Sequence, residues 1–404
     1  MIELGCFDPN VSDTACNAYQ AEVQRLTQLP LTSVKPGIDK FEKRRLVPEA
    51  SAMSVLQIQQ ALQQCGFFPG GKGDGIFGYR TQSAVRLFQE YLRTVEGVDW
   101  TPDGIAGPRT QAELQRWQQQ GLVVPAWAST IEAWRTGATP PDSEHAQWLA
   151  LLQAVKQKYL DEPSAVLKVV NAFTRPTDTQ KVAQWDYDNP AQIHLVGISR
   201  QQFKGLSDDI FVLLIKGLVF KFQGSTEPGA TDNPGGPPFL VPGQHDYRFG
   251  WHKSTYLALR PRSSGVMVVR SNRLDAPLAE RWTAKPPETA GDINIHWGGL
   301  GLKGAVNSWS LGCQIITGGL YLGADGKVVS CQKFAAVSSK DPTERSDKTR
   351  GAYNVLLDLV TALGSDMPGN VVKYTLLLES DLAMAPALQQ RLEADRNRVM
   401  GGVD

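Results

Sequence analysis

The chain has 404 residues, which is long enough for two or three domains that each bury a hydrophobic core. Hydrophobic residues make up 42% of it and charged residues 20%, as in ordinary globular proteins. Lys and Arg total 41, as do Asp and Glu, so the formal net charge is zero. We expect no nucleic-acid partner, because proteins that bind nucleic acids normally carry a basic excess.

The cysteines fit no metal-binding pattern. Their spacings contain no Cys-x-x-Cys pair, and the sequence has no His-x-x-x-His pair. At this density in a long chain, a disulfide scaffold is not expected either. The sequence therefore predicts neither a metal nor an organic cofactor. The five cysteines are Cys6, Cys16, Cys65, Cys313 and Cys331.

The start of the chain shows no targeting signal. "MIELGCFDPNVSD" has neither a basic start nor an apolar core, so no secretory signal peptide is predicted. The longest apolar run, residues 210–220, is interrupted by Lys216 and is too short to span a membrane. Residues 1–50 are interpreted as an N-terminal arm with one helix near residues 14–28.

Residues 51–120 contain an internal repeat. "DGIFGYRTQSAVRLFQ" begins at Asp74 and "DGIAGPRTQAELQRWQ" at Asp103, and eight of the sixteen positions are identical. In each copy Asp-Gly supplies a turn, and an amphipathic helix follows it. Thr81 and Thr110 stand where side chains that cap a helix start are found. The apolar residues expected to share one core are Val85, Phe88, Leu114 and Trp117.

A third helix is predicted ahead of the repeat. In "SVLQIQQALQQCGFFPG" an apolar stripe at helical spacing, Val55, Ile58 and Leu62, is ended by Gly66. With its doubled DGxxGxxT motif, this three-helix unit resembles the peptidoglycan-binding domain of many cell-wall enzymes. The resemblance implies a small helical module that places a catalytic domain on glycan or stem peptide. The alternative is a plain helical bundle with repeated turns.

The rest of the chain predicts a linker and then a mostly-β domain. Residues 121–165 are interpreted as a linker that ends in a helix over about 142–160, and residues 384–404 as a C-terminal helical tail. Between them, residues 166–383 hold short apolar runs separated by turn residues, with one helix at 351–364. The predicted fold class is α+β and multidomain. The expected strands lie in "QIHLVGIS", "DDIFVLLIKGLVFKFQGS", "STYLALRP", "GVMVVRSNR", "GDINIHW" and "VVKYTLLLES".

The stretch "NSWSLGCQII" raises the question of what Cys313 does. It is a buried thiol, half of a disulfide or a nucleophile. "GDINIHWGG" puts His296 at the end of a short strand, and Cys313 stands at the start of the next one. The Gly-rich segment between them lets the two side chains meet, and a base beside a thiol makes it a nucleophile. The backbone N–H groups around Gly312 and Cys313 are candidates for an oxyanion hole.

This arrangement resembles the L,D-transpeptidase (YkuD-like) catalytic domain. The resemblance is carried by His296, Ser310, Gly312 and Cys313 and extends over roughly residues 205–380. It implies a β-rich fold whose cysteine attacks the amide after the third stem-peptide residue of peptidoglycan and forms a thioester. An amine acceptor then gives a cross-link, and water gives a trimmed peptide. By this resemblance Cys313 is the nucleophile and His296 the base, while Ser310 and Gly312 shape the site.

Two positions depart from the family pattern. Leu311 stands where the family usually has histidine between serine and glycine, and Gln314 and Ile315 replace an aliphatic residue followed by Arg or Asn. Glutamine can donate to a substrate carbonyl but cannot pair with a carboxylate as arginine does. The choice between transpeptidation and hydrolysis is therefore left open.

Several nearby residues are candidate substrate contacts. A basic side chain at Arg248 can meet a stem-peptide carboxylate, and Trp309 can form a wall of the cleft, although aromatic core packing is its alternative. The Gly- and Pro-rich stretch 224–243 is too long for a hairpin turn, and such loops on β scaffolds are usually functional or mobile. The full set of candidates is Tyr247, Arg248, His252, Trp309 and Gln314.

Two separate segments thus point to the same polymer. The favoured interpretation is a cell-wall enzyme that forms a Cys313 thioester with peptidoglycan stem peptides, with a slight preference for cleavage over cross-linking. The alternative from another class is a non-catalytic peptidoglycan-binding or structural protein on the same fold. A papain-like protease is a weaker hypothesis, because that family has its cysteine on a helix and ahead of its histidine.

This interpretation places the enzyme at the cell wall or in the periplasm. Without a secretory signal, it predicts export by a route other than the general secretory one, or a phage origin. A contractile secretion apparatus that delivers wall-degrading effectors fits, as does a phage lysis or tail component. The expected partners are peptidoglycan and, for a delivered effector, the secretion apparatus and an immunity protein.

Overall fold

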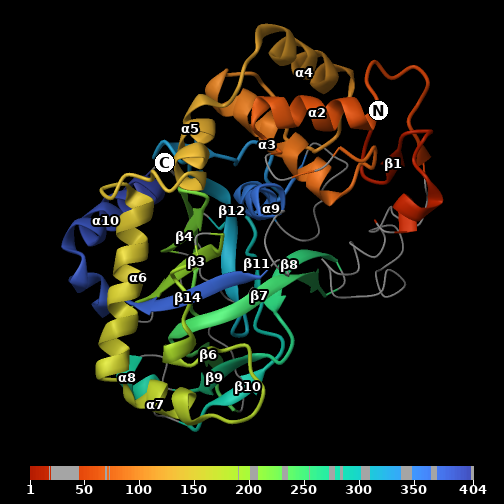
Figure 1. The fold of residues 1–404 in the computed structure, drawn as a ribbon. Coiled ribbons are helices and arrows are strands. Elements are labelled where there is room, and N and C mark those ends of the chain that lie inside the picture. Colours follow the sequence, from red (N-terminus) through yellow and green to blue (C-terminus); the bar gives the residue numbers. More distant parts are fainter. Residues whose placement is uncertain are drawn as a thin grey trace. The chain divides into compact units, whose positions relative to one another are not determined.

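The computed structural model describes residues 1–17, 19, 45–68, 71, 73–189, 191–200, 208–229, 235–253, 255–272, 278–282, 285–301, 310–337, 348–364 and 371–401. Its contacts divide the chain into two compact units, each assembled from segments that are separate in sequence (Figure 1). Unit 1 comprises Met1–Ser129, Phe249–Ala258 and Phe334–Asn370. Unit 2 comprises Thr130–Arg248, Leu259–Lys333 and Val371–Asp404. No helix within the described ranges is long and apolar enough to cross a bilayer.

Unit 1 contains the three helices predicted over residues 51–120. The first begins behind a capping box formed by Ser54 and Gln57 and ends, as predicted, at Gly66 in the left-handed conformation. The predicted shared core is confirmed, since Val85, Phe88, Leu114 and Trp117 are at most 2% exposed. The described elements of this unit are β1 (Cys6–Phe7), β2 (Arg45–Leu46), α2 (Val55–Cys65), α3 (Tyr79–Val95), α4 (Pro108–Gln120) and α9 (Ala352–Leu363).

The predicted helix near residues 14–28 lies only partly within the described residues. Residues 13–17 and 19 are helical, and the remainder of the predicted span is outside them. The helix predicted at 351–364 is confirmed as α9, which packs against α3.

The prediction that Thr81 and Thr110 cap helix starts is wrong. The capping positions are Gly78 and Gly107, three residues earlier, where extended glycine backbone leads into α3 and α4. The two threonines lie in the first turns with their hydroxyls turned inward. Thr81 Oγ1 donates to the Ile76 carbonyl at 3.4 Å, and Thr110 Oγ1 donates to the Ile105 carbonyl at 3.1 Å.

A buried glutamine holds each Asp-Gly turn of the repeat. Gln59 Nε2 donates to Asp74 Oδ1 at 2.8 Å and to Thr81 Oγ1 at 3.0 Å, and its Oε1 accepts the Asp74 N–H at 2.9 Å. Gln89 makes the corresponding bonds in the second copy, to Asp103 Oδ1 at 2.9 Å and to Thr110 Oγ1 at 3.1 Å. The Asp and Thr of the DGxxGxxT motif therefore provide hydrogen-bond partners for the side-chain amide of a glutamine in the preceding helix. A buried amide needs such partners.

The larger described sheet closes into a barrel. Its strands follow the order β11-β8-β7-β14-β3-β4-β5-β12, and β12 pairs back to β11, so the ring closes; β13 is added beside β12. The pairs β14–β3 and β11–β12 are parallel. The strands of this sheet are β3 (Ile193–Ser199), β4 (Asp209–Ile215), β5 (Leu218–Ser225), β7 (Gly243–His252), β8 (Tyr256–Pro261), β11 (Ile295–Trp297), β12 (Gln314–Leu322), β13 (Val328–Ser330) and β14 (Val372–Leu378).

Smaller elements complete the description of the fold. A three-stranded sheet has the order β10-β9-β6. The last residues of β7, the connection to β8 and the first residues of β8 belong to the segment Phe249–Ala258, which clusters with unit 1. The remaining elements are β6 (Pro238–Leu240), β9 (Val266–Arg270), β10 (Glu288–Ala290), α5 (Pro125–Arg135), α6 (Glu144–Asp161), α7 (Ala165–Ala172), α8 (Leu278–Arg281), α10 (Pro386–Gly401) and the 3₁₀ helices η2 (Val182–Gln184) and η5 (Glu379–Met384).

Three segments differ from their predicted structure. Helix α5 occupies part of the predicted linker, because a proline at the first helical position needs no N–H partner and starts a helix readily. Helix α7 stands where β structure was expected. Strand β7 was not predicted, because buried polar residues hide its pattern. Its His245 is fully buried and is bonded through Nδ1 to Thr179 Oγ1 at 2.9 Å and through Nε2 to the Val241 carbonyl at 3.0 Å.

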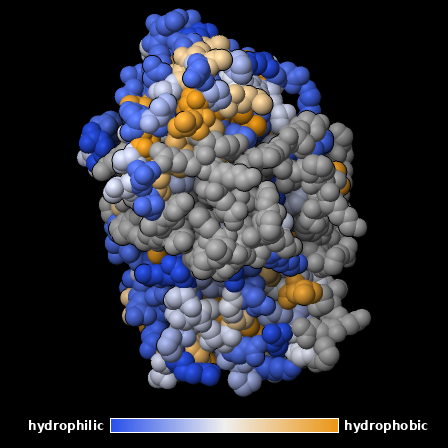
Figure 2. Space-filling view, turned by 90° about the vertical axis from the view of Figure 1, so that its right-hand side faces the viewer, coloured by the Kyte–Doolittle hydropathy of each residue, from blue (hydrophilic) through white to orange (hydrophobic). Residues whose placement is uncertain are grey.

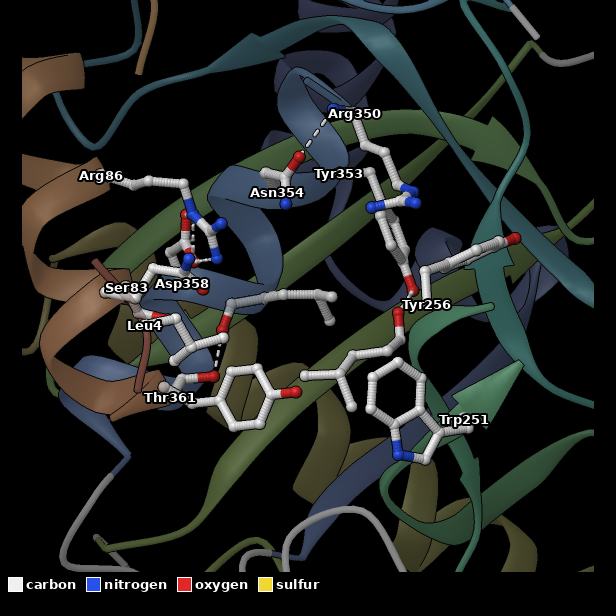
Figure 3. A pocket seen from close by; sticks show the side chains of 14 residues that line it. Leu4, Ser83, Arg86, Trp251, Tyr256, Arg350, Tyr353, Asn354, Asp358 and Thr361 are labelled. Carbon is white, nitrogen blue, oxygen red and sulfur yellow. Dashed lines mark hydrogen bonds and ion pairs between the residues drawn. The ribbon is translucent and has the colours of Figure 1, made fainter. Parts of the chain in front are cut away.

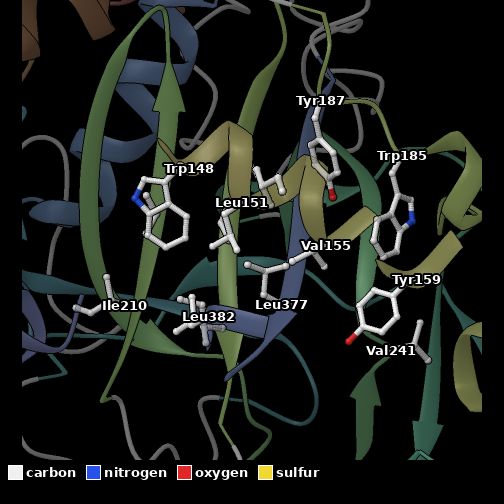
Figure 4. Packing of buried hydrophobic residues seen from close by; sticks show 14 of the residues in the cluster. Trp148, Leu151, Val155, Tyr159, Trp185, Tyr187, Ile210, Val241, Leu377 and Leu382 are labelled. Carbon is white, nitrogen blue, oxygen red and sulfur yellow. The ribbon is translucent and has the colours of Figure 1, made fainter. Parts of the chain in front are cut away.

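The core of unit 2 lies between α6 and the strands that it covers. Figure 4 shows Trp148, Leu151 and Val155 of α6 facing Ile210 of β4 and Leu377 of β14. Each of these side chains is at most 4% exposed. Burying a large apolar side chain stabilises a fold by about 1.5–3 kcal/mol, so this cluster fixes one side of the barrel.

The exposed large hydrophobic side chains are spread along the described chain. On the face drawn in Figure 2, the described residues are mainly hydrophilic and hydrophobic ones occur in small groups. Leu311 is notable among them, because it is 62% exposed and stands two residues before Cys313.

Candidate active site

Cys313 differs from the other cysteines in its exposure. All five are free thiols, and Cys6, Cys16, Cys65 and Cys331 are buried, whereas Cys313 is partly exposed. The disulfide interpretation of Cys313 is thus not what the structure shows. Burial raises the pKa of the Cys65 thiol to about 11, which leaves it protonated and unreactive at neutral pH.

The turn that carries Cys313 is shaped by Ser310 and Gly312. Ser310 Oγ donates to the Cys313 carbonyl at 2.6 Å and accepts the Gly312 N–H at 3.1 Å. Gly312 has φ 141°, a region that favours glycine, and a Cβ there would lie 2.4 Å from Pro238 Cγ. Only glycine therefore fits at position 312 without displacing Pro238.

The thiol lies against the segment that leads into β11. Cys313 Sγ donates to the Asp292 carbonyl at 3.3 Å, and the Asn294 N–H points to Sγ at 3.4 Å. The Gln314 N–H donates to the Asn294 carbonyl at 2.9 Å, which extends the parallel β11–β12 pairing back to the cysteine. These contacts fix the position of the sulfur by backbone groups of its neighbouring strand.

His296 lies in β11, which pairs with the strand that Cys313 directly precedes. In the register of β11 and β12, His296 is opposite Ile315, two residues after Cys313. His296 is 3% exposed, and its Nδ1 is 2.8 Å from the Trp297 carbonyl. A carbonyl only accepts, so Nδ1 carries the proton and Nε2 is the basic nitrogen of the neutral ring. The structure thus brings the predicted base and the predicted nucleophile to adjoining strands.

Two predicted substrate contacts are buried behind this pair. Gln314 is fully buried; its Nε2 donates to the Thr226 carbonyl at 3.3 Å, and its Oε1 accepts the Tyr374 hydroxyl at 2.9 Å. Tyr247 is fully buried and donates to the Ile293 carbonyl at 2.9 Å. Burial raises the pKa of Tyr247 well above its ordinary value. The polar groups of both side chains are thus hydrogen-bonded inside the protein and are not exposed to a substrate.

The other predicted contacts have different locations. Arg248 is half-buried in unit 2, where burial and the neighbouring Arg262 lower its pKa. His252 belongs to unit 1, where its ring centroid lies 5.2 Å from that of Tyr256. Trp309 lies outside the described residues.

The described ends of the predicted functional loop, residues 224–243, adjoin the cysteine turn. The Gly229 N–H donates to the Ser310 carbonyl at 2.8 Å, and Pro238 touches Gly312. Sequence reasoning did not single out Asp292, Asn294 or Pro238. Asp292 and Asn294 could have been found from their position, because they are polar residues directly before the strand that carries His296. No sequence signal points to Pro238, because its contact with Gly312 joins distant segments.

The described ranges contain no group of three or more His, Cys, Asp and Glu side chains arranged to hold a metal ion.

Comparison with known families matches one part of the chain. Residues 51–114 match the family model described as "Putative peptidoglycan binding domain". No curated protein and no solved structure matches the chain significantly. The match supports peptidoglycan binding by unit 1 and association with the cell wall. It does not extend to His296 or Cys313.

Proposed function

We propose that this protein is a cell-wall enzyme in which Cys313 attacks an amide of the peptidoglycan stem peptide. One observation supports the proposal: a partly exposed thiol stands directly before β12, two residues from the position opposite His296, whose Nδ1 is bonded to the Trp297 carbonyl, in a chain with a peptidoglycan-binding segment. Partly exposed thiols beside a base are the ones that act as nucleophiles, whereas buried thiols are inert.

The first half of the reaction forms a thioester. His296 Nε2 takes the thiol proton, Sγ attacks the amide carbonyl carbon, and a tetrahedral oxyanion results. Of the two backbone N–H groups predicted to form an oxyanion hole, that of Gly312 donates to Ser310 Oγ, so it would have to exchange this bond for one to the oxyanion. The carbon–nitrogen bond then breaks, and His296 gives its proton to the departing amine.

The second half of the reaction releases the acyl group, and we propose water as the main acceptor. His296 takes a proton from water, the hydroxide attacks the thioester carbonyl, and Cys313 leaves as the thiolate. One observation supports hydrolysis over L,D-transpeptidation. The Gln314 side chain is fully buried and bonded internally, so it cannot orient an amine acceptor.

A non-catalytic wall-binding protein is the second candidate. The observation that favours it is the extent of the family match, which covers residues 51–114 and stops well before β11. On this view unit 2 would keep the barrel and use it for another purpose.

Mass spectrometry of muropeptides separates these candidates. Purified protein is incubated with peptidoglycan sacculi and with soluble tetrapeptide muropeptides, alongside Cys313→Ala. The matched control is Cys16→Ala, which removes a thiol that is buried in unit 1 and far from β12 in the chain. Loss of the terminal residue with wild type and Cys16→Ala, but not with Cys313→Ala, is the expected result.

The remaining outcomes are equally informative. New 3–3 dimers or amino-acid exchange would replace hydrolysis by transpeptidation. Unchanged muropeptides with all three proteins, while each still sediments with sacculi, would leave the binding protein as the function.

A further inference from the structure

Unit 1 contains a pocket that only partly belongs to the family match. One wall comes from α3, within residues 51–114, and the other walls come from Trp251, Tyr256 and the Arg350–Thr361 segment. Figure 3 shows Trp251, Tyr256, Arg350 and Tyr353 on one side and Ser83, Arg86 and Asp358 on the other. The segments outside the match therefore add further aromatic side chains and a second guanidinium to the Tyr79 and Arg86 side chains that α3 supplies.

The size of the pocket limits what can enter it. The pocket is partly open to solvent, and the space within it that water can reach is about 50 Å³. A cavity needs about 10–15 Å³ to hold one water, so this one takes about three to five waters or one small functional group. A carboxylate with an adjacent methyl fits this space, whereas a whole sugar ring or peptide does not. The remainder of such a ligand would stay outside the pocket.

The cationic side of the pocket is ordered by aromatic packing. The Arg350 guanidinium lies over the Tyr256 ring at 4.4 Å from its centroid, and Tyr353 meets Tyr256 edge-on at 6.2 Å. Tyr353 in turn donates to the Leu257 carbonyl at 3.0 Å. A guanidinium held in one plane is suited to bidentate recognition of a carboxylate, and little side-chain entropy is lost when it binds.

The acidic residue on the opposite side is neutralised by its own partner. Asp358 accepts from Arg86 Nε and Nη2, each at 2.8 Å, and the side chains are 3% and 10% exposed. This pair joins α3 to α9 and compensates the Asp358 charge locally. An anion that enters beside Arg350 therefore does not meet an uncompensated carboxylate at Asp358.

We propose that this pocket binds a carboxylate with a neighbouring methyl group on a peptidoglycan fragment. Arg350 pairs with the carboxylate, and Trp251 and Tyr256 contact the methyl. In the wall this chemistry has two sources: the C-terminal alanine of a stem peptide and the lactyl group of a muramic acid that carries no peptide. The inference rests on the wall-binding part of the proposed function and not on the chemistry of Cys313.

The test measures binding by calorimetry with the full chain carrying Cys313→Ala, so that nothing is turned over. The probes are a tetrapeptide muropeptide, the same compound with its C-terminal carboxylate amidated, a disaccharide with a free lactyl carboxylate, and a neutral chito-oligosaccharide. Arg350→Gln is expected to weaken binding of a carboxylate probe by about 10- to 100-fold. The matched control is Arg135→Gln, which removes an exposed guanidinium paired with Glu132 at 2.6 Å in unit 2, outside the matched segment, and leaves binding unchanged.

The probes also identify the source of the carboxylate. Tight binding of the muropeptide that amidation abolishes assigns the pocket to the stem peptide, and binding of the peptide-free disaccharide assigns it to the lactyl group. Equal binding of the acid, the amide and the neutral sugar overturns the proposal even if Arg350→Gln does not fold. Sedimentation with sacculi is measured in parallel. Retained sedimentation with no preference for carboxylates refutes the pocket alone, and loss of sedimentation refutes wall binding itself.

Discussion

The Ser310 hydroxyl donates to the carbonyl of Cys313 at 2.6 Å, so the residue that precedes the cysteine by three positions closes the turn that presents the thiol. The same oxygen accepts the Gly312 N–H at 3.1 Å. One buried side chain thus satisfies two backbone groups of a turn that has no regular secondary structure.

Replacing Ser310 with alanine is expected to lower the rate of muropeptide cleavage as well as the free energy of unfolding. Loss of the two hydrogen bonds leaves buried backbone groups unsatisfied at a cost of about 1–3 kcal/mol, and the thiol loses its fixed position. We expect muropeptide cleavage to fall at least tenfold. Ser143→Ala is the matched control, because it removes the hydroxyl that caps α6, costs about 1 kcal/mol and leaves cleavage unchanged. Equal turnover by Ser310→Ala and Ser143→Ala would contradict the role of this turn.

Replacing Gly312 with alanine is expected to distort the turn. The new Cβ would lie 2.4 Å from Pro238 Cγ and 2.9 Å from the Pro238 carbonyl oxygen, at a φ of 141° that alanine rarely adopts. We expect a loss of about 1–3 kcal/mol in the free energy of unfolding, together with loss of cleavage. Gly291→Ala serves as control, because a Cβ at Gly291 has no neighbour within 4 Å. A wild-type melting temperature and rate for Gly312→Ala would refute the prediction.

His296→Asn separates the two nitrogens of the imidazole. An asparagine amide can replace Nδ1 as donor to the Trp297 carbonyl, but it offers no basic nitrogen in place of Nε2. We expect cleavage to fall by about 100- to 10,000-fold, with little change in melting temperature. Alkylation of Cys313 by iodoacetamide at neutral pH should slow as well, read by mass spectrometry of the peptide that contains it. Unchanged alkylation and cleavage would remove His296 from the proposed mechanism.

The features predicted correctly depend on residues that lie close together in the sequence. These features are the apolar stripe from Val55 to Leu62, the Asp-Gly repeat and the β structure expected over 208–225. The structure divides that run into two strands, β4 and β5, which are joined by a turn at Lys216 and Gly217, both with positive φ. The neighbouring strands of His296 and Cys313 were also within reach, because each residue adjoins a recognisable apolar run.

The features that were missed depend on contacts between distant segments. Tyr247 and Gln314 are ordinary polar residues in sequence, and only the closed barrel makes them interior. The inclusion of 249–258 and 334–370 in unit 1 has no local signal, since it rests on pairs such as Arg86 with Asp358. The threonines of the repeat were misassigned because glutamines from preceding helices, and not the helix ends, are their partners.

The Arg86–Asp358 pair is expected to be necessary for the stability of unit 1. Asp358→Ala leaves a buried guanidinium without its carboxylate, which typically costs about 3–5 kcal/mol. Arg86→Met combined with Asp358→Leu should recover most of this loss, because it removes both charges and keeps the volume. Urea unfolding monitored by tryptophan fluorescence measures the three free energies. A double variant no more stable than Asp358→Ala would contradict the pairing.

Three buried histidines are expected to make unit 2 sensitive to acid. Burial lowers the pKa of His145 from 6.5 to about 4, and burial also lowers the pKa of His194 and of His245 to about 3; for His194 the neighbouring His145 contributes further. The unfolded chain therefore binds more protons than the folded one below about pH 6.5. The stability that these neutral side chains contribute is complete above pH 6.5 and is lost as the pH falls toward 4.

Asp209 opposes this trend by one proton. Burial raises its pKa from 3.8 to about 7, so its contribution to stability is complete below 3.8 and is lost as the pH rises through 7. On acidification the unfolded chain gains up to three more protons at the histidines than the folded chain does, and the folded chain holds one more at Asp209. The free energy of unfolding is therefore expected to fall between pH 6.5 and pH 4.5. Each net proton contributes a slope of at most about 1.4 kcal/mol per pH unit. Urea unfolding at half-unit pH steps measures it. His194→Gln should flatten the slope and Asp209→Asn should steepen it, and a free energy that is constant or rises as the pH falls would show that these histidines are not buried in the neutral form.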